Sequence, residues 1–246
     1  IFIIRQNKFV KFLFVNLYQY NIMNLTLDIG NTQAKLAVFD DKLLEVKCFD
    51  SKYIHDNIND FLKLFPLIKN LIVCSVIDTD LNFDSYNFQN IHFVSNTSKL
   101  PFINLYNTKR SLGNDRIALV SRAAIKFSNQ NVLIIDAGSC ITYDFINKNN
   151  QYLGGAISPG LKMRFKSLNH YTSNLPLVKS LTESIDIGKT TYDSISNGVC
   201  SGVNYEIEGF IDQYSSKYKN LTVILTGGDS DFLSKRLKIS IFANQN

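Results

Sequence analysis

Two stretches of the chain each place an acidic residue, a glycine and a hydroxyl side chain directly after an apolar run. They are residues 25–39 (LTLDIGNTQAKLAVF) and residues 132–145 (VLIIDAGSCITYDF). Each pattern predicts a strand, a tight turn and a second strand. Glycine lets backbone N–H groups approach an anion closely, and a Thr or Ser hydroxyl adds a donor. The Asp that ends the first strand would meet a phosphate only through a cation, because like charges repel.

Either stretch taken alone is also explained by a β-hairpin with a polar Asx turn. Two copies are harder to obtain by chance, and residues 222–229 (TVILTGGD) add a buried strand that runs into a Gly-Gly turn. An adenine or ribose can lie flat against such a turn. Together the three segments resemble the two phosphate motifs and the adenosine motif of the superfamily that contains acetate and sugar kinases, Hsp70 and actin. Two facing copies are expected to clamp the phosphates and metal of a nucleotide between two domains.

Composition limits the other classes of function. A chain of 246 residues that is 45% hydrophobic and 19% charged can bury a substantial core. The net charge of +5 overstates how basic most of the chain is, because three of the positive charges, Arg5, Lys8 and Lys11, lie in an N-terminal stretch without acidic residues. The rest of the chain carries about +2, which is too little to indicate nucleic-acid binding.

The cysteines are scattered, with no C-x-x-C pair and no neighbouring histidine: Cys48, Cys74, Cys140 and Cys200. Zinc ligation and a disulfide framework are therefore not expected. Cys74 and Cys200 stand among apolar or small residues and are predicted to fill the core. This use of cysteine fits a reducing cytoplasm, so a cytoplasmic protein is expected.

Residues 1–22 are apolar and basic, which is superficially typical of a signal sequence. Lys8 and Lys11 interrupt the apolar run, and no small-residue cleavage site follows it. We expect neither a signal sequence nor a membrane span. Residues 1–22 are instead predicted to be a non-native or dispensable extension, with the working fold beginning at Met23.

From Met23 onward the apolar spacing predicts an alternation of strands and helices. Strands are expected at residues 25–29, 34–39, 43–49, 71–76, 91–94, 132–135, 141–145, 152–157 and 221–225. Helices are expected at residues 54–64, within 112–127, and at 194–214 and 232–237. Three strands, helix, strand, helix, strand occurs twice, which indicates an α/β chain of duplicated ribonuclease-H-like domains in the actin-like ATPase fold, with the nucleotide cleft between them. We expect the domains to span residues 23–114 and 115–246.

The expected domain junction carries the tetrapeptide Gly113, Asn114, Asp115 and Arg116 where a helix should begin. A carboxylate at a helix N-terminus is favoured by the helix dipole, so Asp115 is explained by helix capping alone. The alternative is that Asp115 takes a proton from a substrate hydroxyl while Arg116 holds the anionic end of the substrate. Phosphoryl transfer needs mainly positioning, charge neutralisation and one base. Both explanations remain open at this point.

Further motifs make the resemblance specific. Residues 106–116 (YNTKRSLGNDR), 152–160 (YLGGAISPG) and 187–191 (IGKTT) follow the D-I-G-N-T opening in order. From about Met23 to its end, the chain resembles the type III pantothenate kinase family. The resemblance implies phosphorylation of pantothenate by ATP, the first step of coenzyme A synthesis. The alternative explanation of Gly154-Gly155 and Pro159-Gly160 is that these pairs only form turns between neighbouring elements.

The resemblance also implies roles for individual residues. The base is Asp115, Asp28 works through Mg²⁺, Asp136 binds a monovalent cation (K⁺ or NH₄⁺), and Ser139 meets ATP. The ATP-binding positions of the opening are Asp28, Ile29, Gly30, Asn31, Thr32, Gln33, Ala34 and Lys35. The pantothenate-contacting positions are Tyr106, Gly113, Asn114, Asp115, Arg116 and Thr191. The family is dimeric, so a homodimer is expected, with neither nucleic acid nor membrane as a partner.

This chain departs from the family pattern in places. Ser139 stands where Thr is usual, which keeps the hydroxyl, and Lys109 replaces a Pro that is common shortly after the Tyr. The chain also ends where relatives usually continue through another apolar stretch. These departures are expected to affect stability more than chemistry.

Three classes of function compete: a small-molecule kinase for pantothenate, a regulatory or accessory protein on the same fold, and an actin-like assembly protein. Asp115 with Arg116 favours the first, because a protein that only binds nucleotide needs no base. A polymerising ATPase would need long insertions for lateral contacts, and this chain is too compact for them.

Overall fold

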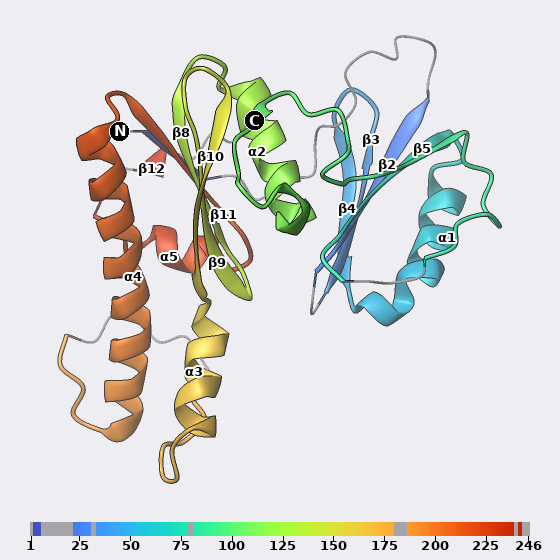
Figure 1. Cartoon of the computed structure of the whole chain (residues 1–246). Helices are drawn as coiled ribbons and strands as arrows, with labels where there is room; N and C mark the ends of the chain where they lie inside the picture. The colour runs from blue at the N-terminus through green and yellow to red at the C-terminus, as the bar shows by residue number, and fades with distance from the viewer. Residues whose placement is uncertain are drawn as a thin grey trace. The chain divides into compact units, whose positions relative to one another are not determined.

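The computed structural model describes residues 2–5, 22–30, 33–77, 81–179, 186–238 and 241–242. The chain forms two compact units, shown in Figure 1. The N-terminal unit is Lys8–Lys126, and the C-terminal unit is Phe127–Asn246 together with Ile1–Asn7.

The N-terminal unit is built on a five-stranded sheet with the order β4-β3-β2-β5-β6. The central strand β2 is antiparallel to β3 and parallel to β5. The strands are β2 (Met23–Ile29), β3 (Ala34–Phe39), β4 (Leu43–Phe49), β5 (Ile68–Ser75) and β6 (Asn90–Phe93). The other elements of this unit are a 3₁₀ turn at Ser51–Tyr53, α1 (Ile54–Leu64), β7 (Ile103–Asn104), a 3₁₀ turn at Lys109–Ser111 and α2 (Asn114–Lys126).

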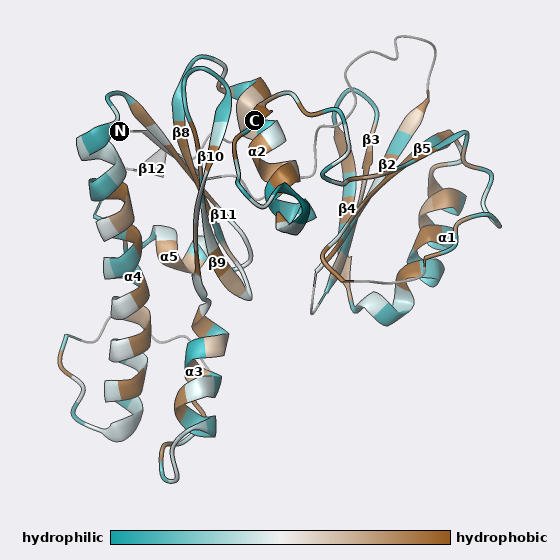
Figure 2. Cartoon of the chain, viewed as in Figure 1, coloured by the Kyte–Doolittle hydropathy of each residue, from teal (hydrophilic) through white to brown (hydrophobic). Residues whose placement is uncertain are grey.

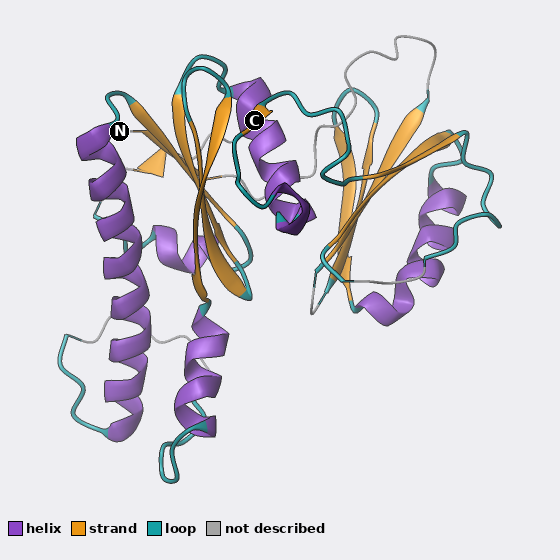
Figure 3. Ribbon diagram, viewed as in Figure 1, coloured by secondary structure: helices purple, strands orange, loops and turns teal. Residues whose placement is uncertain are grey.

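Helix α1 covers one face of this sheet (Figures 1 and 3). Its residues Ile54, Ile58 and Phe61 are buried at helical spacing, and they form a core with alternate residues of β2 and β5. Figure 2 shows the apolar and polar residues alternating around this helix. The buried face of the sheet fixes the register of β2, because a slip by one residue would turn Leu25 and Leu27 out of the core. The position of Asp28 at the end of β2 is therefore well defined.

In the C-terminal unit, the strands lie in the order β12-β1-β11-β8-β9-β10. Strand β8 is parallel to β11 and antiparallel to β9, which is itself antiparallel to β10. The strands are β8 (Asn131–Ala137), β9 (Cys140–Ile146), β10 (Gln151–Pro159), β11 (Leu221–Thr226), β1 (Phe2–Arg5) and β12 (Ile241–Phe242). The helices are α3 (Leu161–His170), α4 (Thr191–Lys217) and α5 (Ser230–Ser234).

The order β10-β9-β8-β11 repeats the order β4-β3-β2-β5 of the N-terminal unit. In both units the second strand returns antiparallel beside the first, and the fourth lies parallel to the first on its other side. The expected α/β architecture of duplicated ribonuclease-H-like units is thus confirmed. The core of the C-terminal unit contains a stripe of α4 that recurs every fourth residue: Ile195, Val199, Val203, Ile207 and Ile211.

The structure differs from two expectations. The units divide after Lys126 and not at residue 114, because α2 packs on β5 of the N-terminal unit. Phe2–Arg5 pairs with β11 and β12, so these four residues lie in a sheet and not outside the fold. The pairing of this segment with β11 satisfies backbone N–H and C=O groups along that edge. Residues 6–21 lie outside the described part, and the dispensability of residues 1–22 stays a prediction.

The structure also bears on the Gly-Gly pair at residues 154–155, for which marking a turn was the alternative explanation. Gly154 and Gly155 are not turn punctuation, since both lie inside β10 beside an irregularity in its pairing with β9. A Cβ at Gly155 would lie 1.5 Å from the carbonyl oxygen of Tyr143, so no other residue fits there. Helix α3, which follows Gly160, was not predicted. Within the described residues, no helix is long and apolar enough to cross a membrane.

Candidate active site

The β2–β3 turn (residues 30–33) carries the first of the predicted phosphate motifs. The Gly30 N–H donates to the Gln33 carbonyl over 3.0 Å, which closes the turn. A Cβ on Gly30 would lie 3.3 Å from that same oxygen, so the turn is tight around the glycine. Ile29 and Ala34, which flank it, are buried. Asn31 and Thr32 lie outside the described residues.

Asp28 faces Lys35 across the β2–β3 pair and Cys74 across the β2–β5 pair. Burial raises the pKa of the Asp28 carboxyl, the Lys35 ammonium lowers it, and the charge of Asp115 raises it further. The net shift is upward. Burial also raises the pKa of the Cys74 thiol, with smaller contributions from Asp28 and Asp115. The structure therefore brings Asp28, Lys35 and Asp115 close enough for their charges to interact.

Asp115 lies in the first turn of α2. The helix begins at Asn114, whose side-chain amide donates to the Ser75 carbonyl at the end of β5 over 3.1 Å. The first helical hydrogen bond runs from the Ile117 N–H to the Gly113 carbonyl, so Gly113 and not Asp115 precedes the helix. Asp115 Oδ1 accepts the Arg116 N–H over 2.8 Å. The carboxylate thus satisfies one N–H of the first turn, but Asp115 is not the capping residue.

Gly113 lets this carboxylate approach the backbone. A Cβ on Gly113 would lie 2.5 Å from Asp115 Oδ1, so any side chain there would displace the carboxylate or itself. Arg116 is buried, and its guanidinium lies over the Tyr106 ring, with Cζ 5.6 Å from the ring centroid. The predicted residues Tyr106, Gly113, Asp115 and Arg116 therefore form one group around the start of α2.

The β8–β9 turn (residues 138–139) carries the second phosphate motif and is built mainly from backbone. Its Gly138 N–H donates to the Cys140 carbonyl over 2.9 Å. Two other glycines lie very close to this turn and to the end of β8. A Cβ on Gly160 would lie 2.2 Å from the Gly138 oxygen, and one on Gly227 would lie 2.5 Å from Asp136 Oδ1. Gly227 also has a φ of 94°, which L side chains rarely adopt.

The Gly-Gly turn after β11 is joined to the end of β8 by hydrogen bonds. The Asp229 N–H donates to the Ala137 carbonyl over 2.9 Å, and Thr226 pairs with Asp136 in the sheet. Burial raises the pKa of the Asp229 carboxyl, and the Lys162 ammonium partly offsets the shift. The structure thus gathers Asp136, the exposed Ser139 and the predicted adenosine turn at one end of this sheet.

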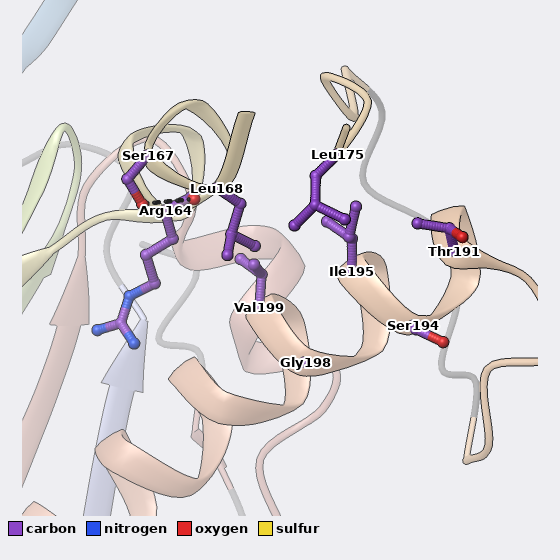
Figure 4. A pocket seen from close by; sticks show the side chains of 9 residues that line it. All are labelled: Arg164, Ser167, Leu168, Leu175, Thr191, Ser194, Ile195, Gly198 and Val199. Atoms are coloured by element: carbon purple, nitrogen blue, oxygen red, sulfur yellow. Dashed lines mark hydrogen bonds between the residues drawn. The ribbon is translucent and has the colours of Figure 1, made fainter. Parts of the chain in front are cut away.

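Thr191 is the first residue of α4, whose N-cap Thr190 accepts the Asp193 N–H over 3.1 Å. It lines a pocket of about 540 Å³ between α3 and α4. Figure 4 shows Leu168 and Val199 pointing toward one another, with Arg164 at one end and Thr191 at the other. The lining residues are Arg164, Ser167, Leu168, Leu175, Thr191, Ser194, Ile195, Gly198 and Val199.

A bound cation must take its protein ligands from the side chains and backbone groups around Asp28 and Asp136. The described residues hold no group of three or more His, Cys, Asp or Glu side chains that could hold a metal ion. A cation at Asp28 would therefore take most of its ligands from phosphate oxygens and water, as Mg²⁺ does in phosphoryl-transfer sites. Asp136 offers carboxylate oxygens beside the Gly227 backbone, which suits a hard cation. Both positions fit the cations expected of them.

Sequence reasoning missed several residues of these sites. Cys74 and Ser75 end β5 beside Asp28 and Asn114, and only the strand register reveals them. Glu206 binds Tyr143, Ser158 and Arg164 from the middle of α4. No spacing in the sequence connects these four residues.

Comparison with known proteins shows the family to which the chain belongs. The model of the type III pantothenate kinase family matches residues 24–213. The chain belongs to the type III pantothenate kinase family. It is 47% identical over 227 residues to the type III pantothenate kinase of Flavobacterium johnsoniae, covering 91% of this chain and 93% of the relative. The corresponding kinase of Christiangramia forsetii is 48% identical over the same coverage.

Among solved structures, the chain resembles a Campylobacter jejuni protein described as a conserved Baf family transcriptional activator. The two are 25% identical with a TM-score of 0.55, over 89% of this chain and 91% of the other. The likeness extends along nearly all of both chains, so it includes both units.

Proposed function

We propose that this member of the type III pantothenate kinase family transfers the γ-phosphoryl group of ATP to pantothenate, giving 4′-phosphopantothenate in the first step of coenzyme A biosynthesis. The observation that carries the proposal is the proximity of two carboxylates at the first phosphate turn. Asp115 stands close enough to Asp28 to raise its pKa, and Arg116 follows directly. A nucleotide-bound cation and a substrate hydroxyl are the partners that such a pair would use.

In the proposed reaction Asp115 accepts the proton of the pantothenate hydroxyl as that oxygen attacks the γ-phosphorus, while the bond from the γ-phosphorus to the bridging oxygen breaks and ADP leaves. Arg116, fixed over the Tyr106 ring, holds the anionic end of the substrate. Residues 28–35 bind ATP, with Gly30 allowing backbone N–H groups to approach the phosphates. Mg²⁺ carried with the phosphates would neutralise their charge, and Asp28 would hold it through water. Thr191 completes the set of pantothenate-binding residues.

The C-terminal unit contributes the second phosphate turn. Asp136 is proposed to bind the monovalent cation (K⁺ or NH₄⁺), and the Ser139 hydroxyl to donate to ATP. The exposure of Ser139 and the glycines that crowd Asp136 support these roles. The cation would supply positive charge beside the phosphates.

The assembly and location of the protein are proposed from its family membership. We propose that it forms a homodimer and that it works in the cytoplasm. All four cysteines are free thiols, which agrees with a reducing compartment.

A coupled assay of ADP release tests the proposed function. ADP release that requires both pantothenate and Mg²⁺, and that is faster in K⁺ than in Na⁺, is expected. Equal ADP release with and without pantothenate would leave only an ATPase. Absence of ADP release, with ATP still bound, would favour an accessory protein. The observation that supports an accessory protein as the second candidate function is the likeness to the Campylobacter jejuni protein.

A further inference from the structure

Glu206 lies in the middle of α4 and joins four elements of the C-terminal unit. Its Oε1 accepts from the Tyr143 hydroxyl over 2.8 Å and from the Ser158 hydroxyl over 2.5 Å. Its Oε2 accepts from Arg164 Nη2 over 2.5 Å. These donors come from β9, β10 and α3. A carboxylate that binds donors on three neighbouring elements fixes those elements relative to one another.

The same contacts reach the junction between β10 and α3 (residues 158–164). Besides contacting Glu206, Arg164 donates from Nε to the Pro159 carbonyl over 2.8 Å and from Nη2 to the Ser158 hydroxyl over 3.3 Å. The guanidinium therefore fastens the first turn of α3 to the end of β10. Planar, charge-assisted contacts of this kind are stronger and more directional than contacts between neutral groups.

This junction touches the β8–β9 turn directly. The Gly160 N–H donates to the Ser139 carbonyl over 3.0 Å, and Pro159 pairs with Cys140 in the sheet. A Cβ on Gly160 would lie 2.2 Å from the Gly138 oxygen, so the junction and the β8–β9 turn are packed directly against each other. A shift of the junction must therefore shift residues 138–139.

The charge state of Glu206 suits this role. Burial raises the pKa of its carboxyl, but hydrogen bonds from Ser158, Arg164 and Tyr143 together outweigh burial, and the net shift is downward. The ionised carboxylate is thus the stable form. Tyr143 is buried, its ring stacks on Phe210 at 4.0 Å between centroids, and burial raises the pKa of its phenol, so it acts as a donor.

We propose that Glu206 is a positioning residue for nucleotide binding, which through Ser158 and Arg164 holds the junction between β10 and α3 against the β8–β9 turn. The inference rests on the proposed function, in which that turn binds ATP. Glu206 is not among the residues assigned to either substrate, so its role is to position others. Its effect is to keep the Ser139 hydroxyl and the Gly138 backbone in the geometry that ATP requires.

The test is the substitution Glu206→Gln. The amide keeps an oxygen for Tyr143 and Ser158, but its NH₂ group would face the donor of Arg164 and release it. The matched control is Asp212→Asn, which removes a carboxylate from an exposed position on the same helix. Binding of ATP and Mg²⁺ without pantothenate is measured by calorimetry below the unfolding transition, together with melting temperature and the KM of each substrate.

We expect Glu206→Gln to bind ATP about tenfold more weakly, equivalent to about 1.4 kcal/mol. The KM for ATP should rise by more than kcat falls, and Asp212→Asn should match the parent. A role confined to stability would lower the melting temperature and leave the ATP affinity of the folded protein within about twofold, which would overturn the inference. A parent chain that does not bind ATP would overturn the proposed function and this inference with it.

A second variant covers the case in which Glu206→Gln does not fold. Ser158→Ala removes one donor and a single oxygen atom, so the fold is retained. Because Ser158 belongs to the junction, we expect weaker ATP binding in the same direction, by about threefold. Tyr143→Phe removes a donor that is outside the junction and should leave ATP binding unchanged. Equal ATP affinities for Ser158→Ala and the parent would contradict the inference.

Discussion

The two phosphate turns occupy equivalent places in the duplicated units but differ in what surrounds them. The β2–β3 turn lies among titratable side chains, where Asp28 has Lys35 and Asp115 as charged neighbours. The β8–β9 turn leaves Ser139 exposed and has backbone as its close neighbour, because a Cβ on Gly160 would lie 2.2 Å from the Gly138 oxygen. The N-terminal unit is thus suited to proton transfer and charge neutralisation, while the C-terminal unit is suited to holding a nucleotide in fixed geometry.

The two units therefore share one strand topology, while the side chains around their equivalent turns differ and suit different chemical roles. Both turns follow the first strand of the unit, and in both strands the next-to-last residue is Asp. Among the described residues, the first turn of α2 places the Asp115 carboxylate near Asp28, whereas in the C-terminal unit the second acidic residue is Asp229, the N-cap of α5, which lies beside the end of β8. A set of substitutions can therefore separate effects on chemistry from effects on binding.

The largest effect is expected from Asp115→Asn. The amide keeps the shape of the carboxylate but cannot accept the substrate proton, so kcat should fall by about 10²–10⁴-fold. ATP binding should stay close to that of the parent, because Asp115 is assigned to pantothenate. Rapid-quench kinetics and ATP titration would measure the two quantities. Near-parental turnover would leave Asp115 with no role beyond its contact in the first turn of α2.

Asp28→Asn should lower Mg²⁺-dependent turnover by about a hundredfold or more, because it removes charge that is arranged to bind the cation. It should also raise the melting temperature of the ligand-free protein at neutral pH. The pKa of Asp28 is raised above its ordinary value of 3.8. Stability linked to this group is therefore present below that value and is lost as pH rises through the folded pKa.

Melting curves of Asp28→Asn and the parent from pH 3.5 to 7.5 would check this linkage, with the range chosen to span about three units above an ordinary Asp pKa. The gain in melting temperature should grow with pH and vanish at the acidic end. A variant that is less stable than the parent at neutral pH would show that Asp28 stabilises the fold, which would remove the contrast between the two turns.

Gly113→Ala should reduce kcat by about 10- to 100-fold, because small displacements of a catalytic group are costly. The new Cβ would lie 2.5 Å from Asp115 Oδ1 and must displace it. The matched control is Gly209→Ala in α4, where a Cβ meets nothing within 4 Å. That change should keep activity and stabilise the helix by about 0.5–1 kcal/mol. Equal activities for the two variants would show that the Asp115 position is not critical.

The smallest effect is expected from Asp136→Ala. It should chiefly remove activation by K⁺, leaving a basal rate equal to that of the parent in Na⁺. Rates measured across a series of K⁺ concentrations at constant ionic strength would show the loss. Full K⁺ activation in this variant would place the monovalent cation elsewhere and weaken the role given to the C-terminal turn.

The local elements were predictable where apolar runs are bounded by strong turn signals. The bounds of β3, β4 and α1 were predicted correctly, since Gly30 and the Asp40-Asp41 pair mark the turns between the strands and α1 has three buried apolar residues at helical spacing. Helix α3 was missed because only Leu161 and Phe165 of its ten residues are buried. Two buried positions are too few to give the helical spacing of apolar residues that predicts a helix.

The site was predictable in its motifs but not in its contacts. The tetrapeptide at 113–116 identified Asp115, whereas the approach of Asp115 to Asp28 depends on how α2 follows β5 in space. Glu206 contacts residues that lie 42 to 63 positions earlier in the sequence, so only tertiary structure reveals these contacts. The domain boundary was misplaced for the same reason, because the packing of α2 on β5 decides it.

The most direct test of this account is to identify the product of the reaction by mass spectrometry. The protein would be incubated with ATP, Mg²⁺, K⁺ and pantothenate, with Asp115→Asn as the matched control. The account predicts that pantothenate gains one phosphoryl group, in an amount equal to the ADP formed, and that Asp115→Asn forms almost none. ADP formation without phosphorylated pantothenate would contradict it.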